Sequence, residues 1–218
     1  MVGGAGAAVR RPLRAAMRLA GAWALLSIAG FVAGAPLFRV ALPWLEPICA
    51  ALLPGFAASL HVVERTPDTV IVLSLQALDA IRLGAHVVVP HLERLEASTT
   101  LLHNLVPPVL LFTTLAALPV RGWRERLLLF ALGFPALALV LALTTPIHLA
   151  GLVETSFEDA AAALGVARPT PLTLRWMLFL EGGGRWLLPL LAALGCRSLL
   201  RVLCGRSDAG EGRLLGKD

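Results

Sequence analysis

The chain has 218 residues, of which 57% are hydrophobic and 15% charged, and its formal net charge is +5. A soluble domain carries roughly 45–50% apolar and about 25% charged residues, so this composition argues against a water-soluble surface. The apolar content also excludes an intrinsically disordered chain, and three cysteines are too few for a disulfide scaffold. The composition therefore predicts a multi-pass membrane protein.

The basic residues flank apolar runs and do not form one solvated face, as a nucleic-acid-binding domain would require. They precede the first run, separate two later runs and follow the last one: Arg10, Arg11, Arg14, Arg18, Arg121, Arg124, Arg126, Arg197, Arg201 and Arg206. Cytoplasmic loops hold such an excess of basic residues. We therefore predict the lipid bilayer as a partner, no nucleic acid, and both termini in the cytoplasm.

A membrane-spanning helix needs about 20 mostly apolar residues. Four segments meet this requirement, and we predict transmembrane helices over residues 19–37, 99–120, 127–150 and 174–196. The segments outside them are a basic cytoplasmic N-terminus, an exported region, an outer loop and a cytoplasmic tail, at residues 1–18, 38–98, 151–173 and 197–218.

The first apolar run has a competing interpretation as a cleaved signal peptide, because Ala33-Gly34-Ala35 resembles a cleavage site. The run is longer than the about 7–15 apolar residues of a signal peptide, so a retained anchor is favoured. The apolar stretch 48–60 is too short to span and predicts an interfacial or buried helix. If it did cross, the later loops would change sides and the excess of basic residues on one side would disappear.

The exported region has the pattern of short strands, near residues 61–65, 70–77 and 85–89. Pro67 and Asp68 suit a turn between the first two, and Ile71, Leu73 and Leu75 share one strand face. We expect a three-stranded antiparallel sheet that rests on the bilayer or on the 48–60 helix.

In the outer loop, Ser156 precedes an alanine run and predicts a short capped helix that ends near Gly165. The fold class is therefore a mainly α integral membrane protein with four transmembrane helices. A small exported α+β insertion, with a short antiparallel sheet, lies between spans one and two.

Glu181 and Arg185 are ionisable residues in the interior of the fourth predicted span. Such residues are costly in a membrane and are candidates for function, although an acid four residues before a base also forms a stabilising pair within one helix. His103, Asn104 and His148 lie near the outer ends of the second and third spans, followed by Glu154. These residues could ligate a metal or relay protons, but polar side chains are also tolerated at the interface.

No catalytic, cofactor-binding or metal motif accompanies these residues. His86 and His91 are five apart and do not share a helical face, and Cys49 is a lone thiol on the outer side that packs an interfacial helix or pairs with His61 or His86. We therefore predict no cofactor and no metal. Glu181, Arg185, His103, Asn104 and His148 are the candidate functional or partner-docking residues.

Three short motifs resemble one family. His103-Asn104-Leu105-Val106-Pro107 opens a span that ends at Leu118-Pro119 before an arginine-rich turn, and Gly184-Arg185-Trp186-Leu187-Leu188-Pro189 lies in the last span. Together with the anchor and the hairpin, this order is similar to that of membrane proteins associated with exosortase H, and the resemblance covers about residues 19–194. The triple glycine with Glu181 and the long outer loop depart from the pattern.

The resemblance implies a non-enzymatic accessory protein of a bacterial inner membrane, working beside exosortase H in the sorting of exported, C-terminally anchored proteins. It transfers no catalytic residues. Two alternatives remain from the residues alone. One is a membrane-embedded enzyme with a Cys/His site at the outer face, and the other is a small transporter, whose sites are often marked by prolines in broken helices.

Overall fold

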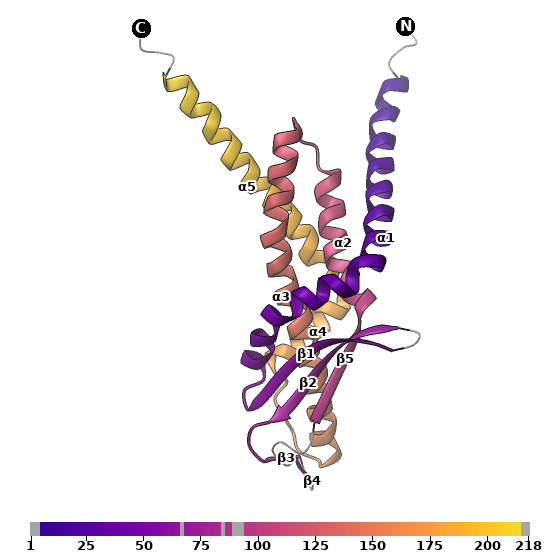
Figure 1. Cartoon of the computed structure of the whole chain (residues 1–218), viewed down its shortest axis with the longest axis vertical. Coiled ribbons are helices and arrows are strands. Elements are labelled where there is room, and N and C mark those ends of the chain that lie inside the picture. Colours follow the sequence, from indigo (N-terminus) through magenta and orange to yellow (C-terminus); the bar gives the residue numbers. More distant parts are fainter. Residues whose placement is uncertain (1–4, 66–67, 84–85, 89–93, 215–218) are drawn as a thin grey trace.

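The structure is a computed structural model that describes the backbone of residues 5–65, 68–83, 86–88 and 94–214, and the side chains of 16–65, 68–80 and 94–204. Long helices run along the longest axis of the molecule, and a small sheet packs against them at one end (Figure 1). The first and last helices extend to the opposite end. The helices are α1 Ala5–Leu52, α2 Leu101–Ala117, α3 Trp123–Ala163, α4 Leu172–Phe179 and α5 Arg185–Leu214.

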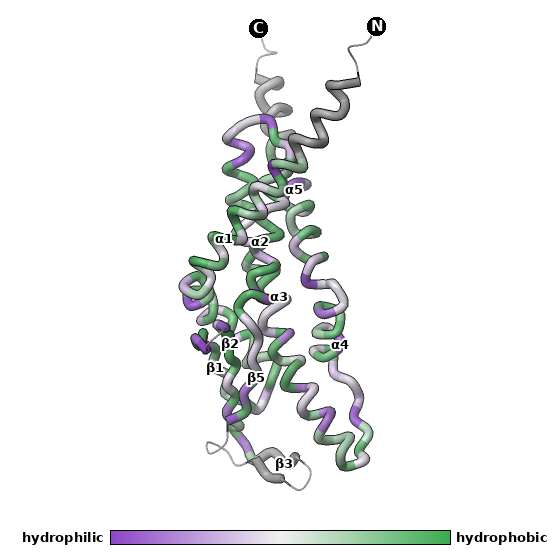
Figure 2. The backbone as a smooth tube through the Cα atoms, turned by 90° about the vertical axis from the view of Figure 1, so that its right-hand side faces the viewer, coloured by the Kyte–Doolittle hydropathy of each residue, from purple (hydrophilic) through white to green (hydrophobic). Residues whose placement is uncertain are grey.

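Three helical segments are long and apolar enough to cross a membrane: Ala16–Leu52, Trp123–Ala163 and Leu172–Cys204. They contain the whole of the predicted spans 19–37, 127–150 and 174–196. The second predicted span, 99–120, corresponds to α2, a shorter apolar helix of 17 residues. Figure 2 shows apolar residues along the middle of these helices, with polar residues at the turn between α2 and α3. The fold is thus mainly helical and compatible with a membrane protein.

The second half of α1 lies across the sheet (Figure 1). Phe38, Leu42, Leu45 and Cys49 recur at the three- or four-residue spacing of one helical face, and all four are buried in the core with the apolar side chains of the sheet. Pro36, Pro43 and Pro47 fall in the same half, where each lacks the backbone N–H that an α-helix uses. Proline is a common cause of helix bending.

The predicted helix 48–60 is wrong beyond its first residues. Helix α1 ends at Leu52, and strand β1 begins at Phe56. Gly55 has a φ of 92°, a conformation that residues with a Cβ rarely adopt, and it follows Pro54. This Pro-Gly pair ends the helix and starts the strand.

The main sheet has three antiparallel strands in the order β1-β2-β5, with β1 at Phe56–Glu64, β2 at Thr69–Ala77 and β5 at Arg94–Thr100. Phe56 pairs with Ala77, and Val70 pairs with Thr100. In β2, Ile71, Leu73 and Leu75 are fully buried in the core that α1 also lines, so the prediction that they share one apolar face is confirmed.

The third predicted strand, 85–89, is wrong as a member of this sheet. Its described part, β4 (His86–Val88), pairs with β3 (Ile81–Leu83) in a separate hairpin, whereas residues 85 and 89 lie outside the described residues. The third strand is β5, so residues 99 and 100 belong to the sheet and not to the predicted helix 99–120. Thr100 is the N-cap residue of α2, and its hydroxyl oxygen accepts from the His103 amide at 3.4 Å.

The predicted short helix of the outer loop is instead the last part of α3. The Ser156 hydroxyl donates to the Leu152 carbonyl and the Thr155 hydroxyl to the Gly151 carbonyl, so both side chains bond within a continuous helix and neither caps a new one. The helix ends at Ala163, close to the expected end near Gly165, and Gly165 has a φ of 68°. The Val166 amide donates back to Ala161, as in a Schellman motif.

The fourth predicted span is not one regular helix. A wide helical turn, Leu180–Gly184, separates α4 from α5, and Gly183 within it has a φ of 118°. A Cβ at Gly184 would overlap the ring of Phe179. The glycines therefore permit a break in the helix that other residues would oppose.

Candidate functional site

The structure brings four of the five predicted functional residues together where the bundle meets the sheet. His103 lies in the first turn of α2, His148 in α3, Glu181 in the wide turn, and Arg185 at the start of α5. We call these four residues the polar cluster. The sequence places its members on three separate segments, and the packing of α2, α3 and α5 brings them into contact.

Glu181 is the centre of the polar cluster. Its Oε1 atom lies 3.0 Å from Arg185 Nη2, 3.4 Å from His103 Nε2 and 3.4 Å from His148 Nδ1. The two imidazole rings are 5.6 Å apart between centroids. Only the Arg185 contact is short enough for a good hydrogen bond, so the guanidinium is the main partner of the carboxylate.

The polar cluster is buried on one side and open on the other. The side chains of Arg185 and His148 are 7% and 8% exposed, whereas those of His103 and Glu181 are 39% and 46% exposed. Arg185 Nη1 and His103 Nε2 are buried atoms without a hydrogen-bond partner among the described residues. The carboxylate therefore connects a buried cation to the surface of the bundle.

The break in the helix sets the position of Glu181. Although residues 181 and 185 have the spacing of a regular helical pair, their ion pair spans the positive-φ Gly183. Trp176 holds α4, the helix before this turn, against α3, since its Nε1 donates to the Leu143 carbonyl at 2.8 Å.

Asn104, the fifth predicted residue, is buried one position away and forms a separate network. Its Oδ1 accepts from the Thr145 hydroxyl of α3 at 2.9 Å, and its Nδ2 donates to the Thr100 carbonyl at 3.0 Å. Nδ2 also lies 3.4 Å from the Thr99 hydroxyl. Asn104 thus joins α2 to α3 and to the end of β5, and it fixes the turn that carries His103.

Sequence reasoning missed Thr145 as a partner of Asn104. One signal was available, because Thr145 precedes His148 by three residues and so lies on the same helical face. The long-range pairing itself has no local signal.

Three atoms of the polar cluster could hold a metal ion: His103 Nε2, His148 Nδ1 and Glu181 Oε1 lie within 4.8 Å of one another. Ligand atoms in a tetrahedral zinc site lie about 3.4 Å apart, which matches the two histidine-to-carboxylate distances. However, Arg185 donates to the same carboxylate oxygen. A metal and the guanidinium would therefore compete for this position.

The other sequence candidates lie elsewhere. Glu154, expected beside His148, instead pairs with Arg168 at 2.7 Å. Cys49 is fully buried in the apolar core, which gives a thiol no access to a substrate. The His61 ring contacts the Ser74 hydroxyl at 3.0 Å, whereas the side chains of His86 and His91 lie outside the described residues.

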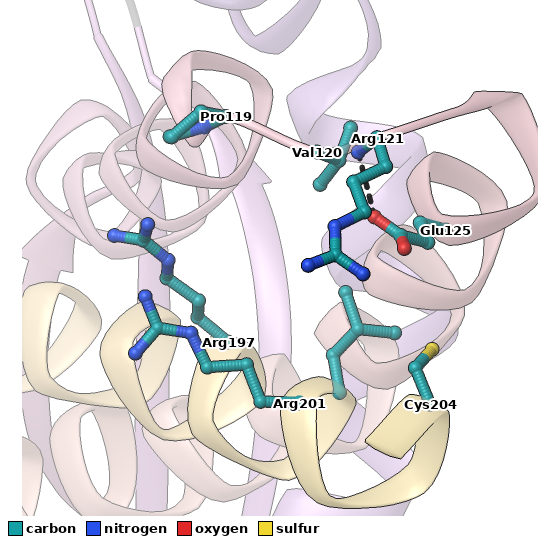
Figure 3. A pocket seen from close by; sticks show the side chains of 8 residues that line it. Pro119, Val120, Arg121, Glu125, Arg197, Arg201 and Cys204 are labelled. Atoms are coloured by element: carbon teal, nitrogen blue, oxygen red, sulfur yellow. Dashed lines mark hydrogen bonds between the residues drawn. The ribbon is translucent and has the colours of Figure 1, made fainter. Parts of the chain in front are cut away.

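A second polar feature lies at the opposite end of the bundle, where the α2–α3 turn faces α5. It is a pocket of about 600 Å³ lined by three arginines, one glutamate and apolar residues (Figure 3): Pro119, Val120, Arg121, Glu125, Arg197, Leu200, Arg201 and Cys204. We call it the basic pocket.

No protein-family model, no curated protein and no solved structure matches this chain. The geometry of its two polar features is therefore the basis for a functional proposal.

Proposed function

We propose that this chain is a non-enzymatic accessory protein of a bacterial inner membrane, and that it binds a sorting enzyme of the exosortase H type through the polar cluster. The observation that carries the proposal is the half-exposed ion pair of Glu181, which is backed by the buried Arg185. The partner named here comes from the resemblance of the motifs around His103 and Arg185.

The physical argument starts from the surroundings of Glu181. The Glu181 carboxylate is half-exposed beside apolar helices, and a polar group in such a place can bond to a polar group on a partner helix. Arg185 holds the carboxylate in one position, so less conformational entropy is lost when a partner binds. A hydroxyl, amide or basic group on a partner helix would bond to the exposed part of the Glu181 carboxylate.

The proposal includes a topology of four spans with both termini in the cytoplasm. Helix α2 has 17 residues, which is the lower end of the about 17–25 that span a bilayer. Arg121, Arg124 and Arg126 lie at the α2–α3 turn, at the end of the bundle away from the sheet. By the positive-inside rule this end is cytoplasmic, and the sheet is then exported.

The exported sheet offers a second docking surface. Strands β1 and β5 are its two edges, and β2 lies between them. An edge strand presents backbone groups that another chain can pair with. The Arg39–Glu64 ion pair of 2.7 Å joins α1 to the end of β1, and it places charges beside that edge.

Site-specific photocrosslinking tests the proposal. A photoreactive residue replaces Gly182, next to Glu181, where an added Cβ would meet nothing within 4 Å. The matched control replaces Gly195 in α5, which is equally free of neighbours. Native membranes are irradiated, and the crosslinked products are identified by mass spectrometry.

A sorting enzyme crosslinked from position 182 and absent from position 195 is the expected result. Arg185→Ala should abolish the product, and Arg175→Ala, an exposed arginine in α4, should leave it intact. Identical products from both positions, or only products formed between copies of this chain, would overturn the proposal.

A further inference from the structure

The basic pocket carries a charge that its own residues do not neutralise. Arg121, Arg197 and Arg201 line it with a single acid, Glu125. The Glu125 carboxylate is already engaged, since its Oε2 accepts from the Arg121 backbone amide at 2.7 Å. The pocket therefore has an excess of positive charge.

Two of these arginines repel each other. Arg197 and Arg201 are four residues apart in α5, and Figure 3 shows their side chains extending on the same side of the helix toward the pocket. Like charges at this spacing destabilise a helix. Within the described residues, neither guanidinium has a hydrogen bond or ion pair, so both are available to bind an anion.

Neighbouring Arg126 shows that a base can be satisfied here by the chain itself. Its Nη1 donates to the Leu115 and Ala116 carbonyls at the end of α2, at 3.0 and 2.8 Å. Such an arrangement neutralises the helix C-terminus. Arg197 and Arg201 have no comparable role, which separates them from the structural arginine.

The pocket lies at the depth where lipid headgroups are expected. Trp123, which is highly exposed, begins α3 beside the pocket, and tryptophan is enriched at membrane interfaces. Exposed apolar side chains follow on both neighbouring helices, among them Leu127 in α3 and Leu194 in α5. An acyl chain could lie against these residues while its headgroup enters the pocket.

We propose that the basic pocket binds the phosphate headgroup of an anionic phospholipid. Basic pockets between membrane helices on the cytoplasmic side are known to bind such headgroups. The guanidinium groups supply paired N–H donors that match phosphate oxygens, and Leu200 and Val120 form an apolar wall. This site is remote from the polar cluster and does not depend on the accessory role.

Native mass spectrometry of the full chain tests the proposal. Protein in a mild detergent is titrated with phosphatidylglycerol or with phosphatidylcholine, which has no net charge. The pocket variant carries Arg197→Gln and Arg201→Gln. The control variant carries Arg124→Gln and Arg175→Gln, which remove the same charge from exposed positions outside the pocket.

We expect preferential retention of phosphatidylglycerol and a roughly thirty-fold weaker affinity for it in the pocket variant. This factor corresponds to about 1 kcal/mol of binding free energy for each of the two arginines removed. The control variant should change by less than about threefold. Equal retention of both lipids, or equal losses in both variants, would overturn the proposal.

Two further measurements separate the remaining explanations. In a competition experiment, inorganic phosphate or glycerophosphoglycerol is added at the same concentration as the lipid. If either compound displaces phosphatidylglycerol, the pocket binds free phosphate compounds and the lipid proposal is wrong. Thermal unfolding checks the fold of both double variants. Without added lipid, the control variant should unfold at the wild-type temperature because its two side chains are exposed. The pocket variant should unfold at the same or a slightly higher temperature, because the repulsion between Arg197 and Arg201 is removed. With lipid, only the protein with an intact pocket should gain stability, and a gain in the pocket variant counts against the site.

Discussion

Replacing Glu181 and Arg185 one at a time with methionine should destabilise the protein by very different amounts. Glu181→Met leaves a guanidinium whose side chain is 7% exposed, whereas Arg185→Met leaves a carboxylate that is 46% exposed. The same ion pair is lost in both variants. The difference in destabilisation between the two variants therefore shows which of the two charges is costly to leave without its partner.

The magnitude follows from the geometry. At 3.0 Å the attraction between the two charges is about 1.4 kcal/mol in a water-like dielectric and about 5.5 kcal/mol at an effective dielectric of 20. Leaving a buried charge unpaired costs about 3–5 kcal/mol, which we expect for Glu181→Met. The half-exposed carboxylate regains hydration, so Arg185→Met should cost about 1 kcal/mol or less.

The measurement is reversible unfolding in mixed micelles, in which sodium dodecyl sulfate is titrated into a mild detergent and helix content is followed by circular dichroism. The double variant is the internal control. It should be close to Arg185→Met, because neither protein contains an unpaired buried charge. If Arg185→Met is as destabilising as Glu181→Met, the explanation by burial is wrong.

Three other perturbations have defined outcomes. Gly183→Ala should destabilise the fold by about 1–3 kcal/mol because φ is 118°, whereas Gly182→Ala, with open space around a Cβ, should not change the denaturation midpoint. A double-mutant cycle of Asn104→Ala and Thr145→Val should give a coupling free energy of about 0.6 kcal/mol and at most about 1.7 kcal/mol. Zero coupling would mean that the hydrogen bond between α2 and α3 does not stabilise the protein. Arg185→Met should bind zinc about tenfold more tightly than the wild type in equilibrium dialysis, as expected when about 1.4 kcal/mol of charge repulsion is removed, and equal affinities would contradict competition at the carboxylate.

Local patterns in the sequence predicted several elements. The apolar runs of α1, α3 and α5 are recognisable from their length, and the shared strand face of Ile71 and Leu73 is recognisable from their alternate spacing. Strand β5 was missed since its inward residues, such as Ala97 and Thr99, are small and only weakly apolar. Its conformation depends on pairing with β2, which lies some 20 residues earlier in the chain.

The polar cluster shows the same division between local and distant contacts. The Glu181–Arg185 pair was predictable, because the two residues are four positions apart. The choice of Glu181 over Glu154 as the acid beside His148 was not predictable, because it depends on how α5 packs against α3. Glu154 has a partner of its own beyond the helix end, Arg168, and Arg168 follows a turn whose geometry requires Gly165.

Strand β5 continues into helix α2 with no loop residue between Thr100 and Leu101. A direct strand-to-helix junction transmits rotation, whereas a flexible linker would absorb it. Asn104 stiffens this junction through its bonds to Thr99 and Thr100, one residue from His103. A change in the tilt of the sheet would therefore also change the orientation of the first turn of α2, which carries His103 into the polar cluster.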